Sequence, residues 1–190
     1  MKNKIVNFFL ILLTILFILV IALIIIKYSK NRINDNKLHS VVDEFNSKVT
    51  SSADNTIVDN IEREPINVEY NGYNVLGIIT IPKIGIEYPI LDTTNDKTMK
   101  IAITKFWGCN VNEIGNFTVA GHNNLDGTMF GKTKKLEIGD RIFIKDTYGV
   151  TLEYEIFDKY LIDPNDVSCV KSVENNTREI TLLTCANRKK

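Results

Sequence analysis

Histidine and cysteine are scarce in this chain, which has two histidines and three cysteines among 190 residues. The cysteines, Cys109, Cys169 and Cys185, form no C-x-x-C pair and do not cluster with the histidines. Zinc sites and thioredoxin-like redox sites both need closely spaced ligands or thiols, so neither is expected, and we predict no metal and no cofactor. An odd number of cysteines also excludes complete pairing within the chain, so at least one thiol is free or pairs outside it.

The chain also lacks an excess of either charge, with 23 basic and 23 acidic residues. A protein that binds nucleic acid is expected to carry a basic surface, because it has to neutralise phosphates. The balance therefore predicts no nucleic-acid partner.

Charge is absent altogether from residues 5–26, "IVNFFLILLTILFILVIALIII". About 20 apolar residues are enough to cross a bilayer as a helix. The apolar part of a cleaved signal peptide is usually about 7 to 15 residues, and here "KYSKNR" follows in place of a small-residue cleavage site. We therefore predict one membrane-spanning helix at 5–26, with residues 1–4 in front of it. Basic residues flank the helix on both sides, with a slight excess on its C-terminal side, which weakly opposes an outward-facing C-terminal domain.

Residues 27–74 have the composition of a polar stalk, rich in Asn, Asp, Ser and Lys, with a weak apolar pattern that could support one short helix. From residue 75 to residue 190 the texture changes to short β-branched runs separated by turn residues. In residues 150–156, apolar and polar side chains alternate, which is typical of a strand with one wet face. Several such runs predict an all-β fold over 75–190, an antiparallel sandwich or barrel.

Two strand-like runs end on side chains that could react: "NFTVAGH" ends on His122 and "EITLLTC" ends on Cys185. Alone, such a cysteine is more often a small buried hydrophobic residue, and such a histidine is more often structural. Together they form a candidate pair, because an ordinary cysteine, with a pKa of about 8.5, needs a base, a cation or a metal to become a nucleophile. His39 lies in the polar stalk and is given no role. Arg178 and Arg188 are the arginines nearest to Cys185 in the sequence and are candidates to stabilise an oxyanion.

Four segments resemble the sortase family. "TLLTC" at 181–185 resembles the T-L-x-T-C signature, and "AGHN" at 120–123 resembles the strand-end histidine motif. "GIITIPKIGIEYPI" at 77–90 is similar to the opening strands, and "DGTMF" at 126–130 is similar to the segment after the histidine. The segments occur in the family's order, after an N-terminal anchor.

This resemblance implies a membrane-anchored cysteine transpeptidase, a thiol protease or hydrolase by class, on the outer face of a Gram-positive cell. Such an enzyme cuts an LPxTG-like sorting signal of a secreted protein and holds the product as a thioester. It then passes the product to an amine of a cell-wall precursor or a pilin. Cys185 would be the nucleophile and His122 the general acid. The implied fold is a closed eight-stranded antiparallel barrel. The resemblance also implies that this domain, residues 75–190, faces outward from a single-pass anchor in the cell membrane, with the N-terminus, residues 1–4, in the cytoplasm.

One departure from the family concerns the end of the sequence, where only "ANRKK" follows Cys185. In the family an arginine on the next strand completes the site. Either Arg188 replaces that arginine, or the eighth strand is missing, and we favour the second interpretation. It predicts a domain that is aggregation-prone and nearly inactive, because an unpaired strand edge invites association.

Two other functions compete with an active sortase. An inactive or truncated sortase-like module could serve as a membrane-tethered binding or assembly subunit. A papain-type hydrolase is disfavoured, because there the cysteine precedes the histidine and opens a helix. The sorting motif, the acceptor amine and the sortase class are left open by the sequence.

Overall fold

The computed structural model describes residues 2–54, 64–171 and 176–186. They divide into two compact units, Met1–Asn36 and Lys37–Lys190. Helix α1 (Lys2–Asp54) begins in the first unit, and its last residues belong to the second.

The first unit consists of the apolar part of α1. Its large side chains are exposed all round the helix, as in Phe17 at 66% and Leu23 at 66%. A helix that is apolar on every side belongs in a protein core or in a membrane. The most apolar window of this helix is 0% buried, so it is not a core helix, and by length and composition it could cross a membrane.

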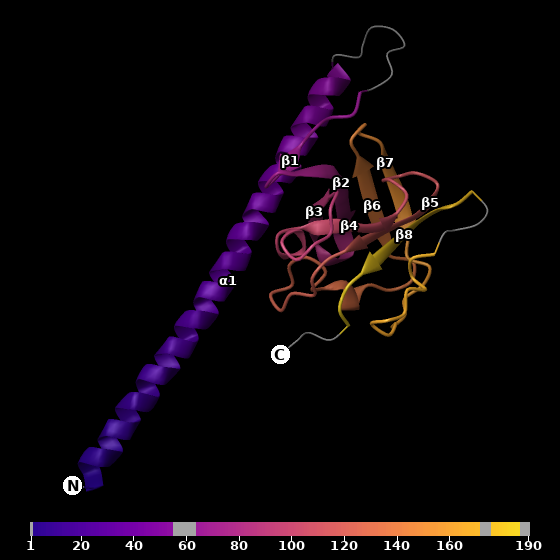
Figure 1. Ribbon diagram of the computed structural model, residues 1–190. Helices are drawn as coiled ribbons and strands as arrows, with labels where there is room; N and C mark the ends of the chain where they lie inside the picture. The colour runs from indigo at the N-terminus through magenta and orange to yellow at the C-terminus, as the bar shows by residue number, and fades with distance from the viewer. Residues whose placement is uncertain (1, 55–63, 172–175, 187–190) are drawn as a thin grey trace. The chain divides into compact units, whose positions relative to one another are not determined.

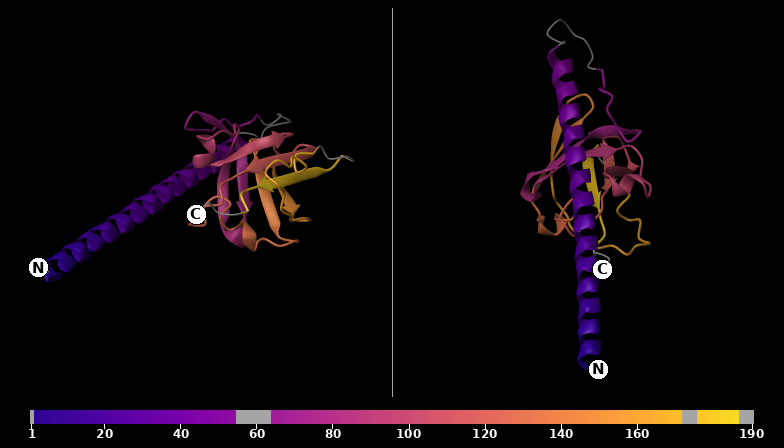
Figure 2. Two further views of the ribbon diagram at one scale, coloured as in Figure 1. Left: turned by 60° about the horizontal axis from the view of Figure 1, so that its bottom comes forward. Right: turned by 90° about the vertical axis from the view of Figure 1, so that its left-hand side faces the viewer.

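The second unit is built around one curved sheet (Figures 1 and 2). Its strands are β1 (Glu69–Tyr70), β2 (Tyr73–Ile81), β3 (Ile86–Leu91), β4 (Ile103–Gly108), β5 (Gly115–Ala120), β6 (Arg141–Asp146), β7 (Thr151–Glu155) and β8 (Arg178–Leu183). Three short 3₁₀ helices connect them: η1 (Pro82–Ile84), η2 (Thr98–Lys100) and η3 (Thr133–Lys135). The strand order is β7-β6-β2-β3-β4-β5-β8, with β1 paired to β2. The sheet curls into a nearly closed barrel, so the predicted all-β barrel is confirmed.

The sheet departs from the prediction in two respects. Two pairs of neighbouring strands, β3 with β4 and β5 with β8, are parallel, whereas the other pairs are antiparallel. Eight strands are present among the described residues, so the expectation that one of eight would be missing is wrong by this count. The alternation of apolar residues did not reveal the two-residue β1, nor β4, whose last three residues are all exposed.

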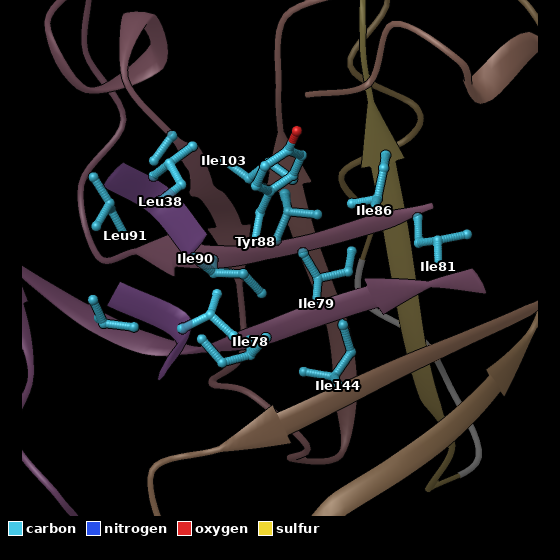
Figure 3. Packing of buried hydrophobic residues seen from close by; sticks show 14 of the residues in the cluster. Leu38, Ile78, Ile79, Ile81, Ile86, Tyr88, Ile90, Leu91, Ile103 and Ile144 are labelled. Atoms are coloured by element: carbon cyan, nitrogen blue, oxygen red, sulfur yellow. The ribbon is translucent and has the colours of Figure 1, made fainter. Parts of the chain in front are cut away.

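The core lies inside this sheet (Figure 3). Ile79, Ile90, Ile103 and Ile144 come from four different strands and are at most 1% exposed. These β-branched side chains suit a strand, which explains why the runs from residue 75 onward form strands.

The C-terminal part of α1 packs against the same core. Leu38 and Phe45 are both 0% exposed, and Val42 between them is 2% exposed, a spacing that puts all three on one face of the helix. Lys145 on β6 donates from Nζ to Asn46 Oδ1 at 2.7 Å. The compact unit therefore begins at Lys37 rather than at residue 75, because the weak apolar pattern in the expected stalk is the docking face of a helix.

We expect the substitution Phe45→Ala to lower the free energy of unfolding of the second unit by about 3–5 kcal/mol, the usual cost of removing a buried phenylalanine. The exposed Asp43, two positions away, provides the matched control Asp43→Ala, with an expected change within about 0.5 kcal/mol. Denaturant unfolding of the full chain in detergent micelles, followed by near-UV circular dichroism, measures both. Equal midpoints for the two variants would show that the helix contributes nothing to the fold.

Candidate active site

The parallel pairing of β5 and β8 brings the two predicted site residues to the same end of the sheet. The register runs from Gly115 opposite Arg178 to Ala120 opposite Leu183. His122 and Cys185 each come two residues after this last pair. Because the strands are parallel, their C-terminal ends lie at one edge, and both reactive side chains follow those ends.

Side-chain exposure separates the three cysteines. Cys185 is exposed, Cys109 is half-buried and Cys169 is buried, and all three are free thiols. Burial raises the pKa of the Cys109 thiol, and the neighbouring Glu113 carboxylate raises this pKa further. The interpretation of Cys185 as a small buried hydrophobic residue is therefore wrong, because this residue is open to solvent.

The segment that carries His122, directly after β5, is held in place by the loop that follows it. Phe130, which is 0% exposed, donates its backbone N–H to the His122 carbonyl at 2.9 Å. Gly121 has to be glycine, because a Cβ there would lie 2.8 Å from the Phe130 ring. Asn123 forms an isolated antiparallel bridge with Met129. The histidine itself remains exposed at the end of this anchored segment.

The "DGTMF" segment has a structural role in the same loop. Asp126 Oδ1 accepts hydrogen bonds from the Thr128 backbone N–H at 3.1 Å and from the Thr128 hydroxyl at 2.7 Å. The turn continues through Met129, whose φ of 51° lies in the left-handed region. These contacts shape the turn that returns the chain to Phe130 and so to the histidine.

Two residues that the sequence reasoning missed connect the strand ends. The Thr184 hydroxyl donates to the Gly121 carbonyl at 2.7 Å, and Asn123 Nδ2 donates to the Cys185 carbonyl at 2.7 Å. Each lies directly beside one member of the predicted pair, within the motifs "AGHN" and "TLLTC". That adjacency was the available signal, since both have side chains able to bond to a neighbouring backbone.

Of the two candidate arginines, the structure describes only Arg178. Arg178 is the first residue of β8 and donates from Nε to the Asn112 carbonyl at 2.8 Å. It therefore stands at the end of β8 opposite to Cys185 and cannot hold an oxyanion there. Arg188 lies outside the described residues.

An exposed thiol and an exposed imidazole that both follow the same end of two paired strands are suited to nucleophilic catalysis with general acid–base help. Within the described part of the chain, no group of three or more metal-ligating side chains is close enough to hold an ion.

Comparison with known proteins gives the family. A family model described as the sortase domain matches residues 79–190, more than half of the chain. Sortase A of Bacillus anthracis is 28% identical over 127 residues, which cover 66% of this chain and 59% of that protein. The match to sortase A of Listeria monocytogenes, 30% identical, covers 61% of this chain and 51% of that protein. The chain thus matches between half and three-fifths of these relatives' length.

Solved structures agree with this match. The sortase D5 transpeptidase of Clostridium perfringens superimposes with a TM-score of 0.57 at 25% identity, covering 81% of this chain and 89% of that one. The confirmed barrel, the matched model and these relatives together show that this chain belongs to the sortase family.

Proposed function

We propose that this protein is a membrane-anchored cysteine transpeptidase that cleaves an LPxTG-like sorting signal and transfers the secreted protein to an amine of a cell-wall precursor or a pilin. The observation that carries the proposal is the exposed Cys185 thiol, which follows the strand paired in parallel with the strand that leads to His122.

In the first half-reaction the Cys185 thiolate attacks the carbonyl carbon of the scissile bond. The tetrahedral intermediate collapses with cleavage of the C–N bond, and the His122 imidazolium gives its proton to the leaving amine. The product is a thioester on Cys185. The acceptor amine then attacks the thioester carbonyl, loses a proton to His122 and releases the thiolate, so the site returns to its starting state.

The oxyanion of both steps needs a hydrogen-bond donor, and one such donor is typically worth about 10² to 10³ in rate. Arg178 binds the Asn112 carbonyl at the far end of β8, so the candidates for that donor are Arg188 and an arginine beyond Lys190. A guanidinium presents a planar fork that a lysine ammonium does not reproduce.

We further propose that residues 5–26 cross the cell membrane once and that the second unit lies outside the cell. The exposed apolar helix supports the span, and the function requires access to secreted substrates and to the wall.

We expect protease added to intact protoplasts to release the second unit as a soluble fragment, because the anchor alone would hold it to the membrane. Immunoblotting of the supernatant measures this release. Protection of the domain until the membrane is permeabilised would reverse the proposed orientation.

We expect Cys185→Ala to abolish both peptide cleavage and transfer, because no other thiol can form the intermediate. The matched control is Cys109→Ala, which removes a thiol whose pKa is raised by burial and should retain activity close to that of the unchanged protein. Chromatography of an LPxTG-type peptide with an amine acceptor measures both steps. Turnover by Cys185→Ala would refute the proposed function.

We expect His122→Ala to lower the rate of transpeptidation by about 10² to 10⁴, the usual range for a general acid. His39→Ala supplies the control, because it removes the other histidine of the chain, an exposed residue on α1. The ring of His39 lies near Tyr88 on β3, with a centroid distance of 5.9 Å. The two variants should differ in kcat measured with the same peptide. A similar small effect of both would remove His122 from the mechanism.

A further inference from the structure

The backbone hydrogen bonds between the β5 and β8 segments stop just before His122 and Cys185. At the start of the paired strands the Gly115 N–H donates to the Thr177 carbonyl at 2.8 Å, and just past their end the Gly121 N–H donates to the Leu183 carbonyl at 3.1 Å. In both bonds the acceptor lies 62 positions after the donor. The next bond of this series would join Asn123 to Cys185. At that position the Asn123 side chain donates from Nδ2 to the Cys185 carbonyl at 2.7 Å, with the same offset of 62.

The side chain is needed there because the backbone after Gly121 turns away from β8. The His122 carbonyl accepts its hydrogen bond from Phe130, and Asn123 forms its bridge with Met129, both in the loop that follows the histidine. The main chain on the histidine side is thus committed to its own loop. An amide that reaches back across the gap restores a link to the cysteine side.

A second bond crosses the same gap in the opposite direction. The Thr184 hydroxyl, on the cysteine side, donates to the Gly121 carbonyl at 2.7 Å. The two bonds flank His122 and Cys185, one before the pair and one after it. Cys185 itself lies beyond the last residue of β8 and is exposed, so packing contributes little to its position.

We infer that Asn123 is a positioning residue for the proposed transpeptidase, which holds the Cys185 backbone level with His122. The inference depends on the proposed function, because the bond from Asn123 to the Cys185 carbonyl can serve catalysis only if His122 and Cys185 react together. Reacting groups need to be held within a few tenths of an ångström of the productive geometry, and a misplacement of about 1 Å can cost about 100-fold in rate.

The first test uses Asn123→Asp and Asn123→Ala in the full chain in detergent micelles. Aspartate has the shape of asparagine, but its carboxylate cannot donate a hydrogen bond and opposes the carbonyl oxygen. We expect kcat for thioester formation with an LPxTG-type peptide to fall about 10- to 100-fold in both variants, with KM nearly unchanged.

The matched control is Asn124→Ala, which removes a neighbouring amide whose Nδ2 donates to the Thr128 hydroxyl at 2.9 Å and not to the cysteine side. It should leave kcat close to that of the unchanged protein. A purely steric role for Asn123 would leave Asn123→Asp as active as the unchanged protein, and that result would overturn the inference.

The second test asks whether Asn123 acts through the pair. Alkylation of Cys185 by iodoacetamide, followed by mass spectrometry, can be measured even in variants that do not turn over. We expect Asn123→Ala to slow alkylation in the unchanged background and to have no further effect when combined with His122→Ala, because the alignment it preserves is then already lost. Losses that multiply in the double variant would show that Asn123 acts independently of His122 and would overturn the inference.

The outcomes separate the inference from the function on which it depends. If Cys185→Ala still transfers the peptide, the proposed function fails. If Cys185→Ala and His122→Ala are both inactive but Asn123→Asp matches the unchanged protein, only the positioning role fails. Thermal unfolding of each variant shows whether a loss of activity comes from a general loss of stability.

Discussion

The proposed active site depends on the parallel pairing of β5 with β8. Antiparallel pairing of the same two strands would send His122 and Cys185 to opposite ends of the sheet, separated by the length of a strand. Parallel strands cannot be joined by a tight turn, so the chain makes β6, β7 and a long connection before β8 returns beside β5. The barrel provides the framework in which two distant segments end at one place.

Asparagine side chains secure this pair at both of its ends. At its beginning the buried Asn116 accepts a hydrogen bond from the Thr181 hydroxyl at 2.9 Å and donates from Nδ2 to the Cys169 carbonyl at 3.1 Å. Asn116 thus connects β5 to β8 and to the segment that leads into it, while Asn123 connects the strands at the reactive end. An amide both donates and accepts and carries no charge, so it can satisfy backbone groups without the desolvation cost of an ion.

The sequence predicted the features that depend on local patterns. The alternation at 116–122 and 179–185 predicted β5 and β8, and the family motifs identified His122 and Cys185 as the candidate pair. It did not predict that the two strands run parallel, because pairing between segments 63 positions apart depends on the whole topology. The sequence predicted a polar stalk with a possible short helix where the docked part of α1 lies. It did not predict the docking itself, since the few buried residues of this part, such as Phe45, are surrounded by solvated ones. Arg178 looked close to Cys185 in the sequence, but an extended strand separates them.

The most direct test of this account is to identify the residue that carries the acyl intermediate. The full chain in detergent micelles is mixed with an LPxTG-type peptide in the absence of an amine acceptor, quenched in acid and digested with pepsin, and the fragments are analysed by mass spectrometry. The account predicts that the N-terminal product of the peptide is attached to the fragment that contains Cys185. An adduct on Cys109 or Cys169, or cleavage of the peptide without any adduct on Cys185, would contradict it.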